Sequence, residues 1–322
     1  MPVKSDWKSV GTGLLEVSLI LTAVFSLATA FDYLHRYLEM FSHFRLQYFV
    51  ASVLLTLAFV ALRWQSYVVV GVATIALNAY LVVPWYLPTE RLDAGGSSDP
   101  TPVKLLHANV LASNHDATRF IELVGEEQPD LIVMQETTPQ WLALLDSIKA
   151  SYPYKLAEPR DDSFGIAFYS KFPLDSTAII ESVPRGIPSL IAEARIGARR
   201  LNIISTHPMP PIGSADYGAR NLQLDSVAQL ASRTPEPLIV IGDLNITMWS
   251  HQYARFEEQS MLQNARRGFG VEPTWPLFLL PAMIPIDHCL VSDGIVVTDF
   301  RTGPAIGSDH LPIIVSVTLP KS

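Results

Sequence analysis

A carboxylate and an amide stand two residues apart directly after an apolar run in the last third of the chain. The run Leu238-Ile239-Val240-Ile241 predicts a buried strand, and Gly242-Asp243-Leu244-Asn245 follows it. A strand that ends in this way delivers the side chains of Asp243 and Asn245 to the edge of a sheet, where loops build sites. Such a pair suits the activation of water beside a divalent cation, so the pattern is typical of metal-assisted hydrolysis of phosphate esters.

Other chemically active side chains fall at the ends of other predicted strands. Each is a weak signal alone, because a glutamate at a strand end is usually solvated and a single histidine is usually structural. The set is Asn109, Gln135-Glu136-Thr137, Thr206-His207-Pro208, Ile286-Asp287-His288 and Ser308-Asp309-His310. Taken together, they predict that several strand ends meet at one site.

Short apolar runs that alternate with helical patterns must position this set. They predict two sheets packed face to face and covered by helices. We expect strands at 103–108, 131–135, 165–169, 179–181, 190–196, 201–206, 238–241, 288–291, 295–300 and 313–318. We expect helices at 115–127, 141–150 and 215–232, the first capped by Asn114.

The first ninety residues have a different composition. Three apolar segments, at 11–31, 45–63 and 64–89, are each close to the roughly 20 residues that cross a bilayer. They predict a three-helix transmembrane anchor over residues 1–90. Two alternatives are buried helices of a soluble protein and a cleaved signal peptide, since Lys4 and Lys8 precede the first segment.

A polar, glycine- and proline-containing stretch at 91–102 predicts a linker before a catalytic domain at 103–322. Three crossings place that domain on the opposite side of the membrane from the N-terminus. Positively charged residues are usually more frequent on the cytoplasmic side. A cytoplasmic N-terminus places three of them inside (Lys4, Lys8 and Arg63) and two outside (Arg36 and Arg45), so it is favoured by one charge. We therefore expect a multi-pass protein of the cell (inner) membrane with an extracytoplasmic catalytic domain.

The charge balance narrows the class of partner. The chain has 31 Asp and Glu against 23 Lys and Arg, a net charge of −8, and the acidic excess lies beyond residue 100. Tight binding of duplex nucleic acid requires a basic face, so this balance disfavours it. The lone Cys289 excludes an intramolecular disulfide and a zinc site with several cysteines. No obligate protein partner can be inferred.

The order of the polar set resembles the endonuclease/exonuclease/phosphatase (DNase I-like) superfamily, in a membrane-anchored bacterial-type form. The resemblance covers about Val103 to Leu319, and the stretch from Gly165 to Pro173 is similar to a strand and turn of the family. It implies an α+β fold, a four-layered α/β/β/α sandwich. It also implies a bound Mg²⁺ or Mn²⁺.

By the same resemblance, Glu136 is a metal ligand helped by Asn109. Asp309 is a further ligand or a turn residue. Arg220 matches a family position near the substrate phosphate, although a surface arginine in a salt bridge remains the alternative.

The resemblance also implies the catalytic roles. His310 is the general base or orients the phosphate, and Asp287 accepts its ring N–H. Asp243 orients or deprotonates the attacking water. Asn245 holds that water or a phosphate oxygen, and His207 donates to the phosphate or protonates the leaving group.

Two details refine the expected activity. Leu111 occupies a position where abasic-site endonucleases carry a metal-site aspartate, which disfavours DNA repair. The uncharged stretch Trp275–Pro285 precedes Asp287 and is a candidate lipid contact. We expect a membrane-anchored phosphoesterase that hydrolyses phosphodiester or phosphomonoester bonds of a lipid or lipid-linked substrate in the lipid bilayer. The alternatives are a metal-dependent endonuclease or exonuclease and a catalytically silent binding domain of the same fold.

Overall fold

The computed structural model describes residues 7–88 and 101–320. The chain divides into two compact units, which are described separately: Met1–Tyr86 with Trp249–His251, and Leu87–Met248 with Gln252–Ser322. Residues 91–100 of the predicted linker lie outside the described residues. Its last two residues, Thr101 and Pro102, belong to the first strand.

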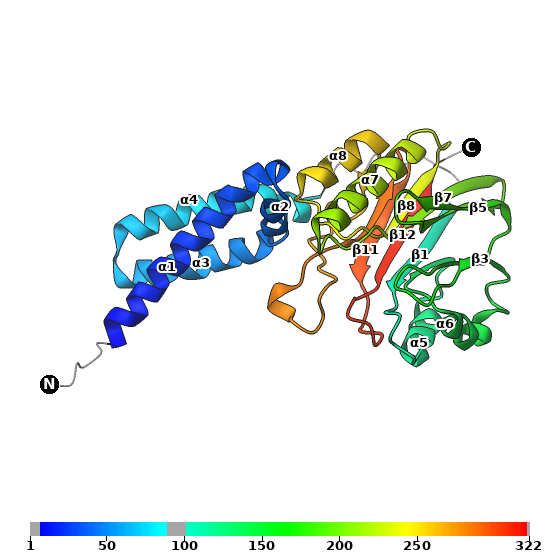
Figure 1. The fold of residues 1–322 in the computed structure, drawn as a ribbon, viewed down its shortest axis with the longest axis horizontal. Helices are drawn as coiled ribbons and strands as arrows, with labels where there is room; N and C mark the ends of the chain where they lie inside the picture. Colours follow the sequence, from blue (N-terminus) through cyan, green and yellow to red (C-terminus); the bar gives the residue numbers. More distant parts are fainter. Residues whose placement is uncertain (1–6, 89–100, 321–322) are drawn as a thin grey trace. The chain divides into compact units, whose positions relative to one another are not determined.

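The first unit is helical, as Figure 1 shows in blue and cyan. Its elements are α1 (Trp7–Ala28), the 3-10 helix η1 (Thr29–Leu34), α2 (Arg36–Ser42), α3 (Arg45–Leu62), α4 (Gln65–Val82) and the 3-10 helix η2 (Val83–Tyr86). Three stretches are long and apolar enough to cross a membrane: Gly11–Leu34, Arg45–Leu62 and Gln65–Tyr86.

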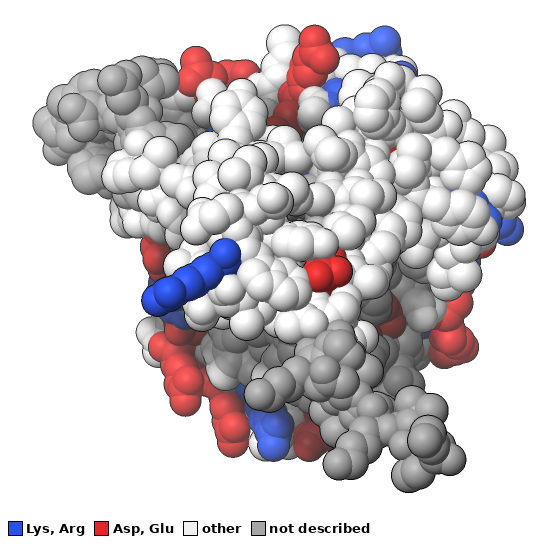
Figure 2. All heavy atoms as spheres, turned by 90° about the vertical axis from the view of Figure 1, so that its left-hand side faces the viewer, with Lys and Arg blue, Asp and Glu red and all other residues white. Residues whose placement is uncertain are grey.

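Most of the apolar surface of these three stretches faces outward. Only 22% of each apolar window is buried, and side chains such as Leu14, Leu54 and Val69 are exposed. The view in Figure 2 is correspondingly mostly white, with isolated charged groups. Exposed apolar surface of this extent does not fit helices of a soluble core.

Close packing and buried polar contacts hold the helices together. A Cβ on Gly71 of α4 would lie 2.1 Å from Oγ1 of Thr56 on α3, so only glycine permits this approach. The guanidinium of Arg45 donates to the carbonyl of Ser26 (2.9 Å) and to Oδ1 of Asn78 (3.3 Å). These contacts join α1, α3 and α4.

The second unit contains two six-stranded sheets within its described residues. The first has the order β11 (Val296–Thr302), β12 (Ile313–Leu319), β1 (Thr101–Asn109), β2 (Leu131–Gln135), β4 (Ile166–Ser170) and β3 (Tyr154–Glu158). The second has the order β5 (Leu174–Ser182), β6 (Ile187–Ile196), β7 (Arg199–Thr206), β8 (Leu238–Asp243), β10 (Asp287–Val291) and β9 (Gln263–Asn264). The pairs β1–β2 and β7–β8 are parallel, and the other pairs are antiparallel.

The space between the sheets changes from apolar to polar along the strands. Since side chains alternate between the two faces of a strand, Val103, Leu105, His107 and Asn109 all point to the same face of β1. The first two belong to the main hydrophobic core, whereas the last two are polar and buried. The other central strands end in the same way, so the polar strand ends meet at one end of the core.

Helices cover the outer faces of both sheets. The helical elements of this unit are α5 (Thr118–Glu127), α6 (Pro139–Leu144), α7 (Ser214–Ala231), α8 (His251–Ser260) and the 3-10 helices η3 (Leu145–Ile148) and η4 (Leu280–Ala282). Phe120 of α5 and Trp141 of α6 pack in the cluster on the outer face of β1 and β2. Tyr253 of α8 lies 4.7 Å, between ring centroids, from His288 of β10. The predicted four-layered α+β sandwich is confirmed.

Three local predictions were wrong or incomplete. Asn114 does not cap the first helix of this unit, because α5 begins at Thr118 and the side chain of Asn114 accepts from the amide of Asp116 instead. The helix predicted at 141–150 starts two residues earlier, as α6, and continues as the 3-10 helix η3, which ends at Ile148. The elements β3, β9 and α8 were not predicted.

Candidate active site

Gly242 and Gln135 bring the two sheets together at the site. A Cβ on Gly242 would lie 2.2 Å from the carbonyl oxygen of Thr206 and 2.5 Å from Nε2 of Gln135, so no other residue fits. The Gln135 amide accepts from the backbone N–H of Asp243 (2.8 Å) and donates to the carbonyl of Thr206 (2.8 Å). This single buried amide from one sheet therefore fixes two strand ends of the other.

The carboxylate of Asp243 is the centre of the network. Its Oδ2 lies 3.4 Å from Nε2 of His207, 3.6 Å from Nε2 of His310 and 3.3 Å from Nδ2 of Asn109. Its Oδ1 accepts from the backbone N–H of Asn245 (2.9 Å). Asp243 thus contacts four of the residues that the sequence assigned to the site.

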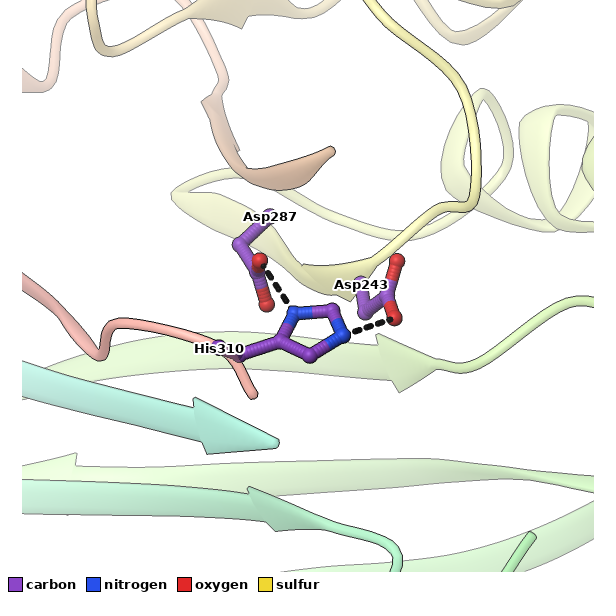
Figure 3. Close-up of side chains that lie close together, drawn as sticks. All are labelled: Asp243, Asp287 and His310. Carbon is purple, nitrogen blue, oxygen red and sulfur yellow. Dashed lines mark hydrogen bonds and ion pairs between the residues drawn. The ribbon is translucent and has the colours of Figure 1, made fainter. Parts of the chain in front are cut away.

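The imidazole of His310 lies between two carboxylates (Figure 3). Its Nδ1 is 2.9 Å from Oδ2 of Asp287, and its Nε2 faces Asp243. Burial alone would lower the pKa of His310, but the charges of Asp287 and Asp243 outweigh it and raise the pKa to about 9. Burial alone would likewise raise the pKa of Asp287, but His310 lowers it. A carboxylate only accepts hydrogen bonds, so Asp287 accepts the Nδ1–H of His310.

His207 completes this wall of the site from the end of β7. Burial opposes its protonation, but the hydrogen bond and charge of Asp243 raise its pKa. Its ring lies 5.5 Å from that of Phe164, measured between centroids. Its Nδ1 has no hydrogen-bond partner among residues 7–88 and 101–320.

Glu136 and Asn109 lie together, as the sequence predicted. Nδ2 of Asn109 donates to Oε1 of Glu136 (3.0 Å), and Oε2 of Glu136 accepts from the amide of Ala112 (3.0 Å). Glu136 has a φ of 60° and Asn245 a φ of 51°, in the left-handed region that non-glycine residues seldom adopt. Backbone strain of this kind clusters at functional sites, where it aims a side chain.

Asp309 and Trp275 form the other side of the site. Nε1 of Trp275 donates to Oδ2 of Asp309 (2.9 Å), and the amide of Leu277 donates to the carbonyl of Asp309 (2.9 Å). A cavity of about 180 Å³ is lined by Glu136, Ser163, Phe164, His207, Pro210, Asp243, Asn245, Trp275, Ile286, Asp309 and His310. This volume is smaller than that of pockets that bind drug-sized ligands, and it suits a group of the size of a phosphate.

Arg220 is buried behind the site and is not a surface residue. Its guanidinium donates to the carbonyl of Asn245 (3.0 Å) and lies over the ring of Tyr217. The alternative of a surface arginine is therefore wrong. In the structure Arg220 contacts Asn245, and its predicted contact with substrate remains a prediction.

Two groups of donor atoms at the site could hold a metal ion. Asp243, Asp287 and His310 have donor atoms within 4.8 Å of one another. In that group, however, both nitrogens of His310 already face carboxylates. Glu136 and Asp309 line one cavity and supply carboxylate oxygens, the ligand type that Mg²⁺ and Mn²⁺ prefer, so they fit such an ion better. Asn109 turns its Nδ2 towards Glu136, and its Oδ1 accepts from the backbone N–H of Leu111.

Sequence reasoning missed two residues that build the site. Gln135 was noted only as part of a strand end, and Trp275 only as part of an apolar stretch. Gln135 occupies the inward face of β2, two residues after the core residue Val133. A polar residue in phase with a core face is the signal that could have identified it.

Comparison with known proteins agrees with this geometry. The structure is similar to D. rerio TDP2 in complex with a single-strand DNA product, with a TM-score of 0.57 and 18% identity over 67% of this chain and 99% of that one. It is similar to an endonuclease/exonuclease/phosphatase from Beutenbergia cavernae DSM 12333, with a TM-score of 0.56 and 17% identity over 68% of this chain and 72% of that one. It is also similar to sphingomyelinase C from Streptomyces griseocarneus, with a TM-score of 0.52 and 17% identity over 67% and 99%.

At these identities the likeness shows the fold alone. The search of curated proteins found no match. The model of the endonuclease/exonuclease/phosphatase family matches residues 106–310, which is more than half of the chain and includes every residue of the network. The chain belongs to the endonuclease/exonuclease/phosphatase family.

Proposed function

We propose that this chain is a membrane-anchored, Mg²⁺- or Mn²⁺-dependent phosphodiesterase that acts on a lipid or lipid-linked phosphate. The observation that carries the proposal is the composition of one small cavity. Asp243, His207 and His310 line it together with the acidic residues Glu136 and Asp309. Carboxylates for a cation and imidazoles for an anion in one cavity suit a phosphate ester.

The metal fits the proposed reaction. Enzymes of this family are hydrolases of phosphate esters that depend on divalent metals. Bound at Glu136 with Asn109 and Asp309, the cation would neutralise a nonbridging oxygen and stabilise the charge on the leaving oxygen.

The side chains of the network supply the proton transfers. Both nitrogens of His310 face carboxylates, which favours the doubly protonated ring as a donor that orients the phosphate. An imidazolium accepts no proton, so Asp243 takes the proton of the attacking water. Asn245 holds that water or a phosphate oxygen, and His207 protonates the leaving oxygen.

An apolar loop beside the cavity supports a membrane substrate. After Trp275 at the rim, Phe278, Leu279 and Leu280 are 77%, 51% and 66% exposed. Exposed apolar residues beside a site can enter the headgroup region of a bilayer. The three apolar helices would anchor the catalytic unit to a membrane, and the positive charges of the first ninety residues favour its extracytoplasmic side.

The first experiment tests the chemistry. Full-length protein in detergent should hydrolyse bis-p-nitrophenyl phosphate in the presence of Mg²⁺ or Mn²⁺, and EDTA should abolish the reaction. His310→Ala should abolish it as well. A wild-type protein without metal-dependent turnover would contradict the proposal and favour the silent binding domain.

The second experiment tests the lipid contact. Replacing Phe278, Leu279 and Leu280 with Ser should lower hydrolysis of phospholipid vesicles and spare the soluble diester. Met261 is 65% exposed on another loop, so Met261→Ser is the matched control and should spare both substrates. An equal loss on both substrates in the loop variant would contradict the lipid contact.

A nuclease is the second candidate. The similar D. rerio TDP2 structure holds a single-strand DNA product, which favours this alternative. The acidic excess of the catalytic region opposes it, because tight binding of a phosphate backbone is favoured by a positively charged surface.

A further inference from the structure

We infer that His107 is a positioning residue that holds Asp287, and through it His310, in the geometry required for catalysis; this rests on the proposed function. His107 lies on β1, in the sheet opposite Asp287. Its Nδ1 is 3.5 Å from Oδ1 of Asp287, and both side chains are fully buried. The inference assigns it no contact with substrate.

The first support is that neither atom has another hydrogen bond of normal geometry. Oδ1 of Asp287 and both ring nitrogens of His107 make none within the described residues, although Gln135 faces the ring and Thr274 faces the carboxylate. The other oxygen of Asp287 accepts from His310. A buried polar atom without a partner destabilises the fold, so a small closure of the 3.5 Å gap would stabilise both groups at once.

The second support is the chemistry of the two groups. A carboxylate only accepts hydrogen bonds, so the ring nitrogen that faces it must carry a proton. Nδ1 is the ring nitrogen of His107 that faces Oδ1 of Asp287, so the geometry assigns the N–H to Nδ1. The three side chains then form the series His107–Asp287–His310.

The third support is position. His107 continues the face of β1 whose preceding members, Val103 and Leu105, are core residues. An aliphatic residue would satisfy packing there at lower cost than an imidazole without ordinary partners. A polar residue beside an active site, at a position where packing favours an apolar one, indicates that function constrains the residue type.

Two substitutions separate the inferred role from packing. His107→Leu removes the N–H and keeps the apolar volume. His107→Asn keeps an N–H close to the position of Nδ1. His288 is the matched control: it is equally buried, but its ring contacts the carbonyl of Ile246 and the side chain of Asn264 instead of Asp287.

The kinetic test uses full-length protein and bis-p-nitrophenyl phosphate. His107→Leu should lower kcat about tenfold or more with KM within about twofold, as loss of an orienting partner does. It should not lower Tm. His107→Asn should recover most of kcat, and His288→Asn should lower Tm without changing kcat per folded molecule. Wild-type kcat in His107→Leu, or an equal loss in His107→Asn, would overturn the inference.

A spectroscopic test does not depend on activity. In ¹⁵N-histidine-labelled protein, His107 should carry its proton on Nδ1, and His107→Leu should shift the His310 ring signals while His288→Asn should not. A proton on Nε2 of His107, or unchanged His310 signals, would overturn the inference. Absence of wild-type turnover would contradict the proposed function, and the spectra would still decide the role of His107.

Discussion

At the scale of single residues, the site depends on contacts that allow little substitution. Asp243 is shared by His207, His310 and Asn109, and its position is fixed by Gly242 and Gln135. Because one carboxylate oxygen faces three donors, a small displacement of β8 would alter every one of these contacts.

Gly242 provides a direct test of that dependence. Gly242→Ala places a methyl group 2.2 Å from the Thr206 carbonyl, so it should destabilise the protein by about 1–3 kcal/mol and reduce turnover. Gly125 in α5 has no heavy atom within 4 Å of the corresponding position. Gly125→Ala should stabilise the helix by about 0.5–1 kcal/mol. Equal stability of both variants in chemical denaturation would contradict the close approach.

His310 is predicted to act in the chemical step. His310→Gln should lower kcat about 10²–10³-fold, the range for loss of a donor that stabilises charge on the phosphate in the transition state. KM should change much less. An unchanged kcat in single-turnover kinetics would exclude this role.

The buried ring of His288 should make the folded protein less stable at acid pH. Burial, followed by the charge of Arg266, lowers its pKa from 6.5 to about 3. Because the folded-state pKa is lowered, its stabilising effect is complete above pH 6.5 and is lost as the pH falls from 6.5 towards 3. Denaturation of wild type and His288→Asn should therefore show a stability difference that narrows over this range. A constant difference would contradict a neutral buried ring.

At the scale of elements, the inward faces of the strands explain what the sequence could predict. The residues Asp243, Asp287 and His310 could be found because their types are rare at strand ends and follow a family order. His107 was not found, because it lies inside β1 and the sheet opposite supplies its partner Asp287. Gln135 ends β2, and its phase with the core residue Val133 was the signal that could have identified it. A surface position was considered for Arg220 because a sequence does not show that the backbone carbonyl of Asn245 accepts a hydrogen bond from the Arg220 guanidinium.

Other elements were missed for reasons of local composition. Helix α8 buries only Tyr253, Phe256 and Ser260, so its apolar period is too sparse to predict a helix. The cap at Asn114 was wrong because its side chain closes a local turn before α5 begins. Both cases depend on contacts that short sequence windows do not contain.

The helices of the first unit carry their own prediction. Gly71→Leu should separate α3 from α4, because Thr56 occupies the space of the new side chain. Gly13 of α1 has open space, so Gly13→Leu is the control. Thermal unfolding in detergent should show a lower Tm only for Gly71→Leu. Equal values would contradict the packing.

At the scale of the whole molecule, chemical labelling can determine the side of the membrane on which the catalytic unit lies. Native Cys289 is fully buried, whereas Met261 is 65% exposed. Met261→Cys in intact cells should therefore react with a membrane-impermeant maleimide if the catalytic unit lies outside the cytoplasm, and wild type should not. Labelling of Met261→Cys only after the cells are broken would place the unit inside.

The most direct test of the central claim compares two substrates with one preparation. Full-length protein with Mg²⁺ or Mn²⁺ should release phosphorylated headgroups from phospholipid vesicles and leave single-stranded and plasmid DNA intact. EDTA and His310→Ala should each abolish that release. Cleavage of DNA with no attack on the vesicles would contradict the account and identify the chain as a nuclease.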